Sequence, residues 1–311
     1  MIGARDHGGA LDAAVARWGG TRSDWLDLST GINPQPYPLP QIPPEAWTAL
    51  PDSGALTRLE QSARRFWRIP DAAEVLAVPG ASAAIAQLPR LRPAGRVEIP
   101  GPTYNEHGAA FRLAGWTLTE EAPDALVAVH PNNPDGYLWS ADRLAAPLTI
   151  VDESFCDVCP DRSHIALAAR PGCVVLKSFG KFWGLAGLRL GFAIGDPDLV
   201  AALKDALGPW AVSGPACTIG AEALSDPAWA AETNRRLTDD AARLDTILTA
   251  QGAEVVGGTT LFRLYRVDNG EAAQEHLARH RILTRVFPYA DDWLRVGLPP
   301  AHRWDQLESA F

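Results

Sequence analysis

Short apolar runs alternate with helical patterns through the middle of the chain, and this alternation constrains the fold more than any other feature. Strands that alternate with helices form a mostly parallel sheet that is buried on both faces. The helices are expected at Gly54–Arg68, Ala81–Leu91 and Asn105–Ala114. The strands are expected at Val75–Val78, Arg96–Ile99, Ala125–His130, Leu148–Asp152, Val174–Ser178 and Arg189–Ile194. The pattern predicts an α/β domain.

The two ends of the chain have a different character. The stretch up to about Pro51 is rich in Pro and Gly, which predicts an extended arm without a packed helix. After Pro197 the pattern predicts a smaller α+β region. We therefore expect an arm with part of the small domain at 1–45, a large domain at 46–208 and a small domain at 209–311. Helices are predicted at Asp198–Leu207, Trp229–Gln251 and Glu271–His280, and strands at Glu254–Val256, Leu261–Tyr265, Ile282–Val286 and Trp293–Val296.

Composition narrows the class of protein. The 311 residues are 47% hydrophobic and 21% charged, as in ordinary globular enzymes. The formal net charge of -9 without a basic stripe disfavours nucleic acid as a partner. No apolar run reaches the roughly 18 residues of a membrane span, and the first residues lack a signal-peptide pattern. We expect no membrane partner and a cytoplasmic location.

Four cysteines raise the question of a metal or redox site. Cys156 and Cys159 form a C-x-x-C, whereas Cys173 and Cys217 stand apart. A C-x-x-C is typical of a redox pair or of half a zinc site. Because no second C-x-x-C occurs in the sequence, we interpret all four as reduced structural cysteines and expect no metal.

The segment at 177–195 carries the strongest chemical signal. Lys181 lies just beyond a predicted strand and is followed by a glycine-rich turn, so its amine can reach into a cleft. Lys177 lies nearby but belongs to the strand itself. Ser178 and Arg189 could both hold a phosphate, the hydroxyl by one hydrogen bond and the guanidinium by a bidentate pair.

Three further segments follow predicted strands. Asn133 lies in the turn HPNNPDG, and Asp152 ends the strand before ESF. VPGASAAI is a strand, a turn and a helix start, where backbone N–H groups and Ser82 could bind phosphate. Ligands of open α/β sheets bind at the carboxyl ends of the strands, so we expect these segments to meet in one site.

These four motifs, in this order, resemble those of fold-type I pyridoxal-5′-phosphate (PLP) enzymes, the aspartate aminotransferase superfamily. The resemblance implies a PLP cofactor, with Lys181 as its Schiff-base lysine. It implies that Asp152 pairs with the protonated pyridine nitrogen, which lets the ring act as an electron sink. The other implied cofactor contacts are Ala81, Ser82, Tyr104, Asn133, Phe155, Ser178 and Arg189. A protein of this fold that only binds a ligand would be expected to lack Lys181, Asp152 or Asn133.

Within the superfamily, the chain is most similar to the branch of histidinol-phosphate aminotransferases and threonine-phosphate decarboxylases. His7–Gly9, Ser29–Pro34 and Asp152–Asp161 resemble the decarboxylase signatures, and Phe155 stands where the aminotransferases usually have Tyr. The resemblance implies decarboxylation of L-threonine O-3-phosphate to (R)-1-aminopropan-2-yl phosphate in cobalamin biosynthesis. The alternative is a class I/II aminotransferase for a phosphorylated substrate such as histidinol phosphate.

The same resemblance implies how the substrate is recognised. Arg295 matches the arginine that pairs with the substrate carboxylate, and Arg285 matches one that contacts the substrate phosphate. His7 and Asn33 on the arm are further candidates for substrate binding. A homodimer is also implied, although Leu50 stands where the family commonly has a Tyr that reaches the partner subunit's cofactor phosphate.

Overall fold

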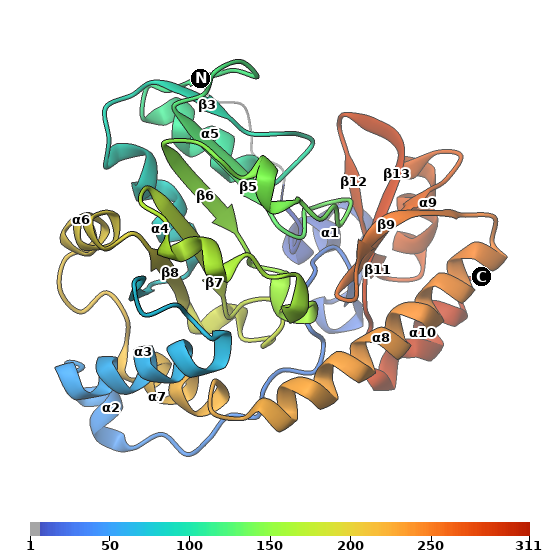
Figure 1. Ribbon diagram of the computed structural model, residues 1–311. Coiled ribbons are helices and arrows are strands. Elements are labelled where there is room, and N and C mark those ends of the chain that lie inside the picture. Colours follow the sequence, from blue (N-terminus) through green and yellow to red (C-terminus); the bar gives the residue numbers. More distant parts are fainter. Residues whose placement is uncertain (1–6) are drawn as a thin grey trace. The chain divides into compact units, whose positions relative to one another are not determined.

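The computed structural model describes residues 7–311, which form two compact units (Figure 1). The first unit comprises Pro36–Asn133 and Tyr137–Ala231. The second comprises the described residues up to Gln35, the short segment Pro134–Gly136, and Glu232–Phe311.

The first unit is built on a seven-stranded sheet with the order β2-β8-β7-β6-β5-β3-β4. Neighbouring strands are parallel, except that β8 runs antiparallel to both β2 and β7. This mostly parallel sheet confirms the α/β class. The strands are β2 (Glu74–Val78), β3 (Arg96–Glu98), β4 (Thr117–Leu118), β5 (Ala125–Val129), β6 (Leu148–Asp152), β7 (Cys173–Ser178) and β8 (Gly191–Gly195).

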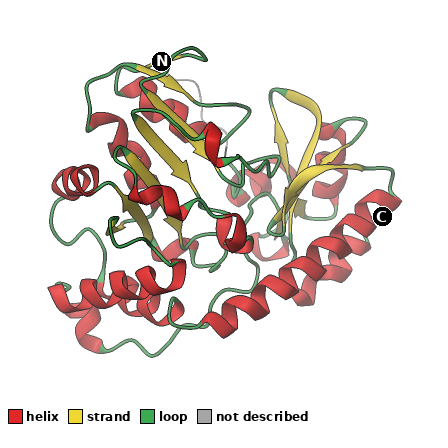
Figure 2. Cartoon of the chain, in the orientation of Figure 1, coloured by secondary structure: helices red, strands yellow, loops and turns green. Residues whose placement is uncertain are grey.

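Helices precede, connect and follow these strands along the chain (Figure 2). α3 begins where Asp52 accepts a hydrogen bond from the backbone N–H of Ala55 at 2.7 Å, which satisfies one of the free N–H groups of its first turn. The helices are α2 (Pro44–Thr48), α3 (Ser53–Trp67), α4 (Ala81–Gln87), α5 (Asn105–Leu113), α6 (Pro197–Leu207) and α7 (Gly214–Ala223). One core of this unit contains Ile85 of α4, Phe111 of α5, Leu203 of α6, and Val174 and Leu176 of β7.

The ends of five strands meet at one edge of this sheet. Val129, the last residue of β5, lies opposite Asp152 at the end of β6. Ser178 at the end of β7 lies opposite Gly191 at the start of β8, and Gly191 lies opposite Val78 at the end of β2. The loops that join the strands at these residues therefore lie side by side, as the sequence predicts for a site at the carboxyl ends of the strands.

The second unit has an α+β structure, as predicted. Its four-stranded antiparallel sheet has the order β12-β13-β10-β9, and β1 pairs with β11 in parallel. The strands are β1 (Leu26–Asp27), β9 (Glu254–Thr259), β10 (Phe262–Arg266), β11 (Ile282–Leu283), β12 (Arg285–Phe287) and β13 (Ala290–Gly297). The helices are α1 (Leu11–Trp18), α9 (Gly270–Arg279), α10 (Trp304–Glu308) and the part of α8 (Pro227–Ala250) from Glu232 onward.

The prediction of an arm without helices is wrong, because the structure contains α1 and α2. Leu11, Val15 and Trp18 recur at helical spacing and pack with Trp25 and Leu283 in a small core. The surrounding Gly and Pro residues obscure this short amphipathic pattern in the sequence.

The boundary between the two compact units also differs from the predicted domain boundary. The chain leaves the first unit within α8, after Ala231, whereas the prediction placed the boundary at 208. α7 lies between these positions and contacts α2 and α3 in the first unit. Among residues 7–311, no helix is both long and apolar enough to span a membrane.

Candidate active site

A cavity of about 130 Å³ lies at this edge of the sheet in the first unit. All nine residues that the sequence predicts to contact a cofactor line this one cavity, although they come from six separate segments. They are Ala81, Ser82, Tyr104, Asn133, Asp152, Phe155, Ser178, Lys181 and Arg189. The lining combines a lysine and an arginine with a buried carboxylate, which suits a cofactor that carries an aldehyde, a phosphate and a basic ring nitrogen.

Asp152 is held in its ionised form by three hydrogen bonds. Its side chain is buried, one oxygen lies 2.8 Å from Nε2 of His107, and the other accepts from the backbone and hydroxyl of Ser154 at 3.0 and 2.5 Å. Burial by itself would raise the pKa of Asp152, but these hydrogen bonds and the His107 imidazole lower it below its ordinary value. A carboxylate that stays ionised can keep a basic ring nitrogen protonated.

The sequence interpretation missed His107 and Ser154 as partners of Asp152. His107 follows Tyr104 by three residues at the start of α5, a spacing that places both side chains on one side of the helix. The Tyr104 and His107 rings lie edge to face, with centroids 6.1 Å apart. Helical spacing from the predicted ring-stacking residue was the signal that could have identified His107.

Lys177 and Lys181 have contrasting surroundings. Lys177 lies within β7, is buried, and forms an ion pair with Glu153 at 2.7 Å. Burial lowers the pKa of Lys177, but the carboxylates of Glu153 and Asp157 raise it above its ordinary value. Lys181 lies beyond the strand and lines the cavity, with Nζ 5.1 Å from the centroid of the Phe155 ring. The structure therefore places Lys181, and not Lys177, where its amine can meet a ligand.

The Arg189 side chain packs against Gly80. Any side chain at position 80 would displace the Arg189 guanidinium. A Cβ atom at Gly80 would lie 2.5 Å from Nη2 of Arg189, and Gly80 has a φ of 78°. Arg189 itself has a left-handed backbone with φ 54° and donates from Nη1 to the carbonyl of Ala186 at 2.9 Å. This packing holds the guanidinium beside the start of α4, where Ala81 and Ser82 line the cavity.

Asn132 links the turn that carries Asn133 to the segment before Tyr104. Its side-chain amide donates to the carbonyl of Pro102 at 3.0 Å and accepts from the hydroxyl of Thr103 at 2.6 Å. These bonds hold two walls of the cavity together.

A second hollow, of about 240 Å³, lies within the second unit. His7 and Arg285, two predicted substrate contacts, both line it, together with Arg17, Ser29 and Thr284. The backbone N–H of Gly9 donates to the Ser29 hydroxyl at 2.7 Å. The structure therefore joins the two N-terminal signatures, His7–Gly9 and Ser29–Pro34.

Asn33 and Arg295 lie elsewhere in the second unit, and the linings of the two cavities do not include them. Both side chains are buried against protein groups. Asn33 Oδ1 accepts from Arg236 at 2.7 Å, and Arg295 donates to the carbonyl of Ser29 at 2.7 Å while its guanidinium covers the Phe262 ring.

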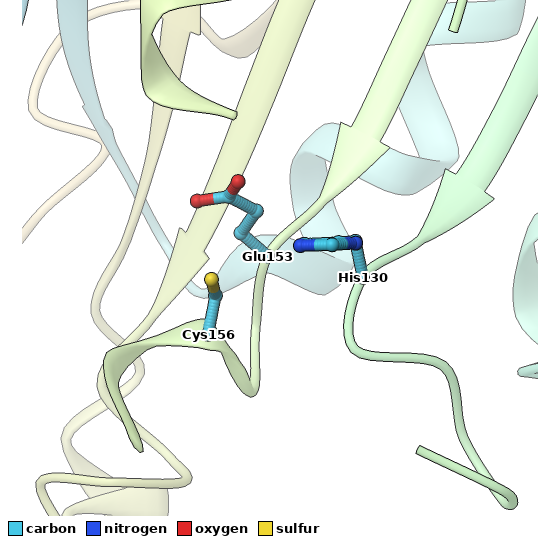
Figure 3. A group of neighbouring side chains, drawn as sticks. All are labelled: His130, Glu153 and Cys156. Atoms are coloured by element: carbon cyan, nitrogen blue, oxygen red, sulfur yellow. The ribbon is translucent and has the colours of Figure 1, made fainter. Parts of the chain in front are cut away.

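His130, Glu153 and Cys156 form the one group in residues 7–311 whose atoms lie close enough to share a metal ion (Figure 3). The imidazole of His130 accepts from the backbone N–H of Trp139 at Nδ1, so Nε2 carries the proton and donates to the carbonyl of Arg162 at 2.8 Å. Glu153 is already paired with Lys177. A metal ion would have to displace these partners, so we assign no metal to the group. The four cysteines are free thiols.

Comparisons with known proteins agree with a cofactor site of this kind. A model of the family "Aminotransferase class I and II" matches residues 24–311. A threonine-phosphate decarboxylase of Pseudomonas aeruginosa is 40% identical over 98% of this chain and 97% of its own length. A second one, from a Sinorhizobium species, is 42% identical over 94% and 93%. The crystal structure of a histidinol-phosphate aminotransferase from Clostridium acetobutylicum superposes with a TM-score of 0.79 at 20% identity, covering 92% of this chain and 97% of that one.

Proposed function

Because the chain belongs to the aminotransferase class I and II family, we propose that it is a PLP-dependent decarboxylase of L-threonine O-3-phosphate. The observation that supports this substrate is the identity of 40% and 42% to two threonine-phosphate decarboxylases over almost their whole length. A product of (R)-1-aminopropan-2-yl phosphate and a role in cobalamin biosynthesis follow from the same proposal.

The cavity that the nine predicted residues line supports the cofactor assignment. In the proposal, Lys181 binds the cofactor aldehyde, Asn133 donates to its phenolic oxygen, and Tyr104 covers its ring. Ala81, Ser82, Ser178 and Arg189, which line the same cavity, would hold the phosphate. When bound, PLP supplies a conjugated ring that accepts the electron pair released at Cα.

The residues of the cavity then have separate tasks. Asp152, kept ionised by His107 and Ser154, holds a proton on the ring nitrogen. Lys181, whose side chain lines the same cavity, would return a proton to the substrate carbon that has lost CO₂. Phe155 offers no hydroxyl near the Lys181 amine, in contrast to the Tyr of the aminotransferases.

Substrate recognition is assigned to the second unit. We propose that Arg285 and His7 bind the substrate phosphate, supported by their presence in one hollow with a second cation, Arg17. Arg295 would bind the carboxylate, with Asn33 as a further substrate contact. A planar guanidinium suits both groups because it offers two parallel N–H donors.

Carbon dioxide release separates the proposed reaction from its alternative. Purified protein loaded with PLP and given L-threonine O-3-phosphate should release one CO₂ per substrate without any added keto acid. Turnover of histidinol phosphate that depends on added keto acid, with no CO₂ from threonine phosphate, would instead identify an aminotransferase.

Replacing Arg285 with Gln should raise KM for L-threonine O-3-phosphate by between about 10- and 100-fold, because one charge-assisted contact to the phosphate is lost. Turnover of unphosphorylated L-threonine should stay unchanged. The measurement is the rate of CO₂ release against substrate concentration. Arg266→Gln is the matched control, since this exposed arginine of β10 pairs with Glu254 and Asp292. Equal losses on both substrates would argue against a phosphate contact.

We also propose a homodimer. Large apolar side chains are exposed on the first unit, including Trp47 of α2 at 66%, Leu50 at 65% and Trp210 at 57%. Contiguous exposed apolar side chains mark surfaces that bind another chain, and Trp47 and Leu50 lie only three residues apart in the sequence. Leu50 cannot donate the hydrogen bond that the family's Tyr makes, so its part in such an interface would be apolar contact.

A further inference from the structure

The segment that carries Lys181 is anchored by the indole of Trp183, two residues further on. This side chain is completely buried and stacks with the rings of Phe179 and Trp229, with centroids 5.1 and 5.3 Å away and planes tilted by 12° and 13°. Its Nε1 donates to one carboxylate oxygen of Asp157 at 3.1 Å. The indole is therefore enclosed by protein and has its N–H directed at one acceptor, which leaves it little freedom to move.

Asp157 receives a second indole from a different part of the chain. Its other oxygen accepts from Nε1 of Trp67, the last residue of α3, at 2.9 Å, and Nζ of Lys177 lies 3.5 Å away. Asp157 is buried, so these donors replace the water that would otherwise solvate its charge. The carboxylate thus holds two tryptophans and the buried Lys177 together.

This bond joins the two loops that carry the proposed chemistry. Asp157 lies five residues after Asp152, in the loop that follows β6, whereas Trp183 lies in the loop that follows β7 together with Lys181. The backbone N–H of Gly184 donates to the carbonyl of Lys181 and that of Leu185 to Phe179, so the Lys181 loop is closed on itself. The Trp183 bond ties this closed loop to the one that begins at Asp152.

We propose that Asp157 and Trp183 are positioning residues, which fix the Lys181 loop relative to Asp152 through their buried hydrogen bond. The lysine side chain is long and flexible, so the place of its amine depends on how firmly its backbone is held. A shift of about 1 Å at a reacting group can cost about 10²-fold in rate. This inference rests on the proposed role of Lys181 in binding the cofactor.

Trp183→Phe and Trp67→Phe form a matched pair of variants. Each removes one indole N–H from the same buried carboxylate, but only Trp183 lies in the Lys181 loop. We expect Trp183→Phe to lower kcat by between about 10- and 100-fold with KM within twofold of wild type. Trp67→Phe should leave kcat within about twofold, although both variants lower Tm by similar amounts.

Hydrogen exchange supplies a readout that does not depend on activity. In the PLP-loaded protein, the backbone amides of residues 178–185 should exchange faster in Trp183→Phe than in wild type, and Trp67→Phe should leave them unchanged.

Asp157→Asn keeps an acceptor for one indole only, so it should show part of the kcat loss. In a double-mutant cycle, adding Trp183→Phe to Asp157→Asn should cost less than Trp183→Phe alone.

Equal kcat losses in Trp183→Phe and Trp67→Phe, or unchanged exchange of residues 178–185 in Trp183→Phe, would overturn the inference. If Trp183→Phe does not fold, the amide exchange of residues 178–185 in Asp157→Asn tests the inference in its place. Failure of the proposed substrate would be seen separately, as wild-type protein that releases no CO₂ from threonine phosphate. The exchange comparison would still report on the anchor.

Discussion

Lys181→Ala should lower the rate of CO₂ release from L-threonine O-3-phosphate by at least about 10³-fold. The variant loses both the amine that binds the cofactor aldehyde and the group that returns a proton to the substrate carbon, and proton transfer of this kind contributes about 10²- to 10⁴-fold. The rate should be followed over a single turnover, so that slow release of product is excluded.

Two features make this variant easy to interpret. Lys181 lines a cavity and lies beyond the end of β7, so its truncation should leave Tm close to that of wild type. Lys204→Ala is a suitable control, because Lys204 lies on the exposed side of α6. A Lys181→Ala protein that retains more than a tenth of the wild-type rate would contradict the proposed role.

Asp152→Asn should lower kcat by between about 10²- and 10³-fold, since a neutral amide cannot stabilise a proton on the ring nitrogen. The loss should appear in kcat and not in KM, because substrate binding is assigned to other residues. The measurement is initial CO₂ release at saturating substrate, with Asp161→Asn as the control. Asp161 is exposed on the same loop. An Asp152→Asn protein with wild-type kcat would remove the carboxylate from the proposed chemistry.

The same substitution should change how stability depends on pH. The pKa of Asp152 is lowered in the folded protein, so its hydrogen bonds with His107 and Ser154 stabilise the fold above the ordinary Asp pKa. This contribution is lost as the pH falls through the lowered value. Asp152→Asn should therefore be less stable than wild type at neutral pH, and the difference should shrink in acid.

Most strands of the large sheet and several residues of the cavity could be predicted from the sequence for one physical reason. Buried parallel strands read as short apolar runs, and polar residues that follow such runs meet at one edge of the sheet. Asp152 and Ser178, which end β6 and β7, and Lys181, which lies just beyond β7, follow this rule. Arg189 was placed inside a strand, whereas its left-handed backbone puts it before β8 begins at Gly191.

Elements without a one-sided apolar pattern could not be predicted in this way. α7 is buried on nearly all sides, with Pro215, Ala216, Cys217 and Ile219 among its buried residues, so its sequence has no amphipathic period. The hydrogen bonds of Asp157 with Trp67 and Trp183 join positions far apart in the sequence. Such contacts depend on tertiary packing, which periodicity does not report.

Reduction of the PLP-loaded protein with borohydride, followed by peptide mass mapping, tests the central claim most directly. Borohydride converts a lysine–cofactor bond into a stable amine, and the chain has three lysines, at positions 177, 181 and 204. We predict that the added pyridoxyl mass lies on the peptide containing Lys181, at that residue alone. Mass on Lys177 or Lys204, or no added mass after loading, would contradict the account.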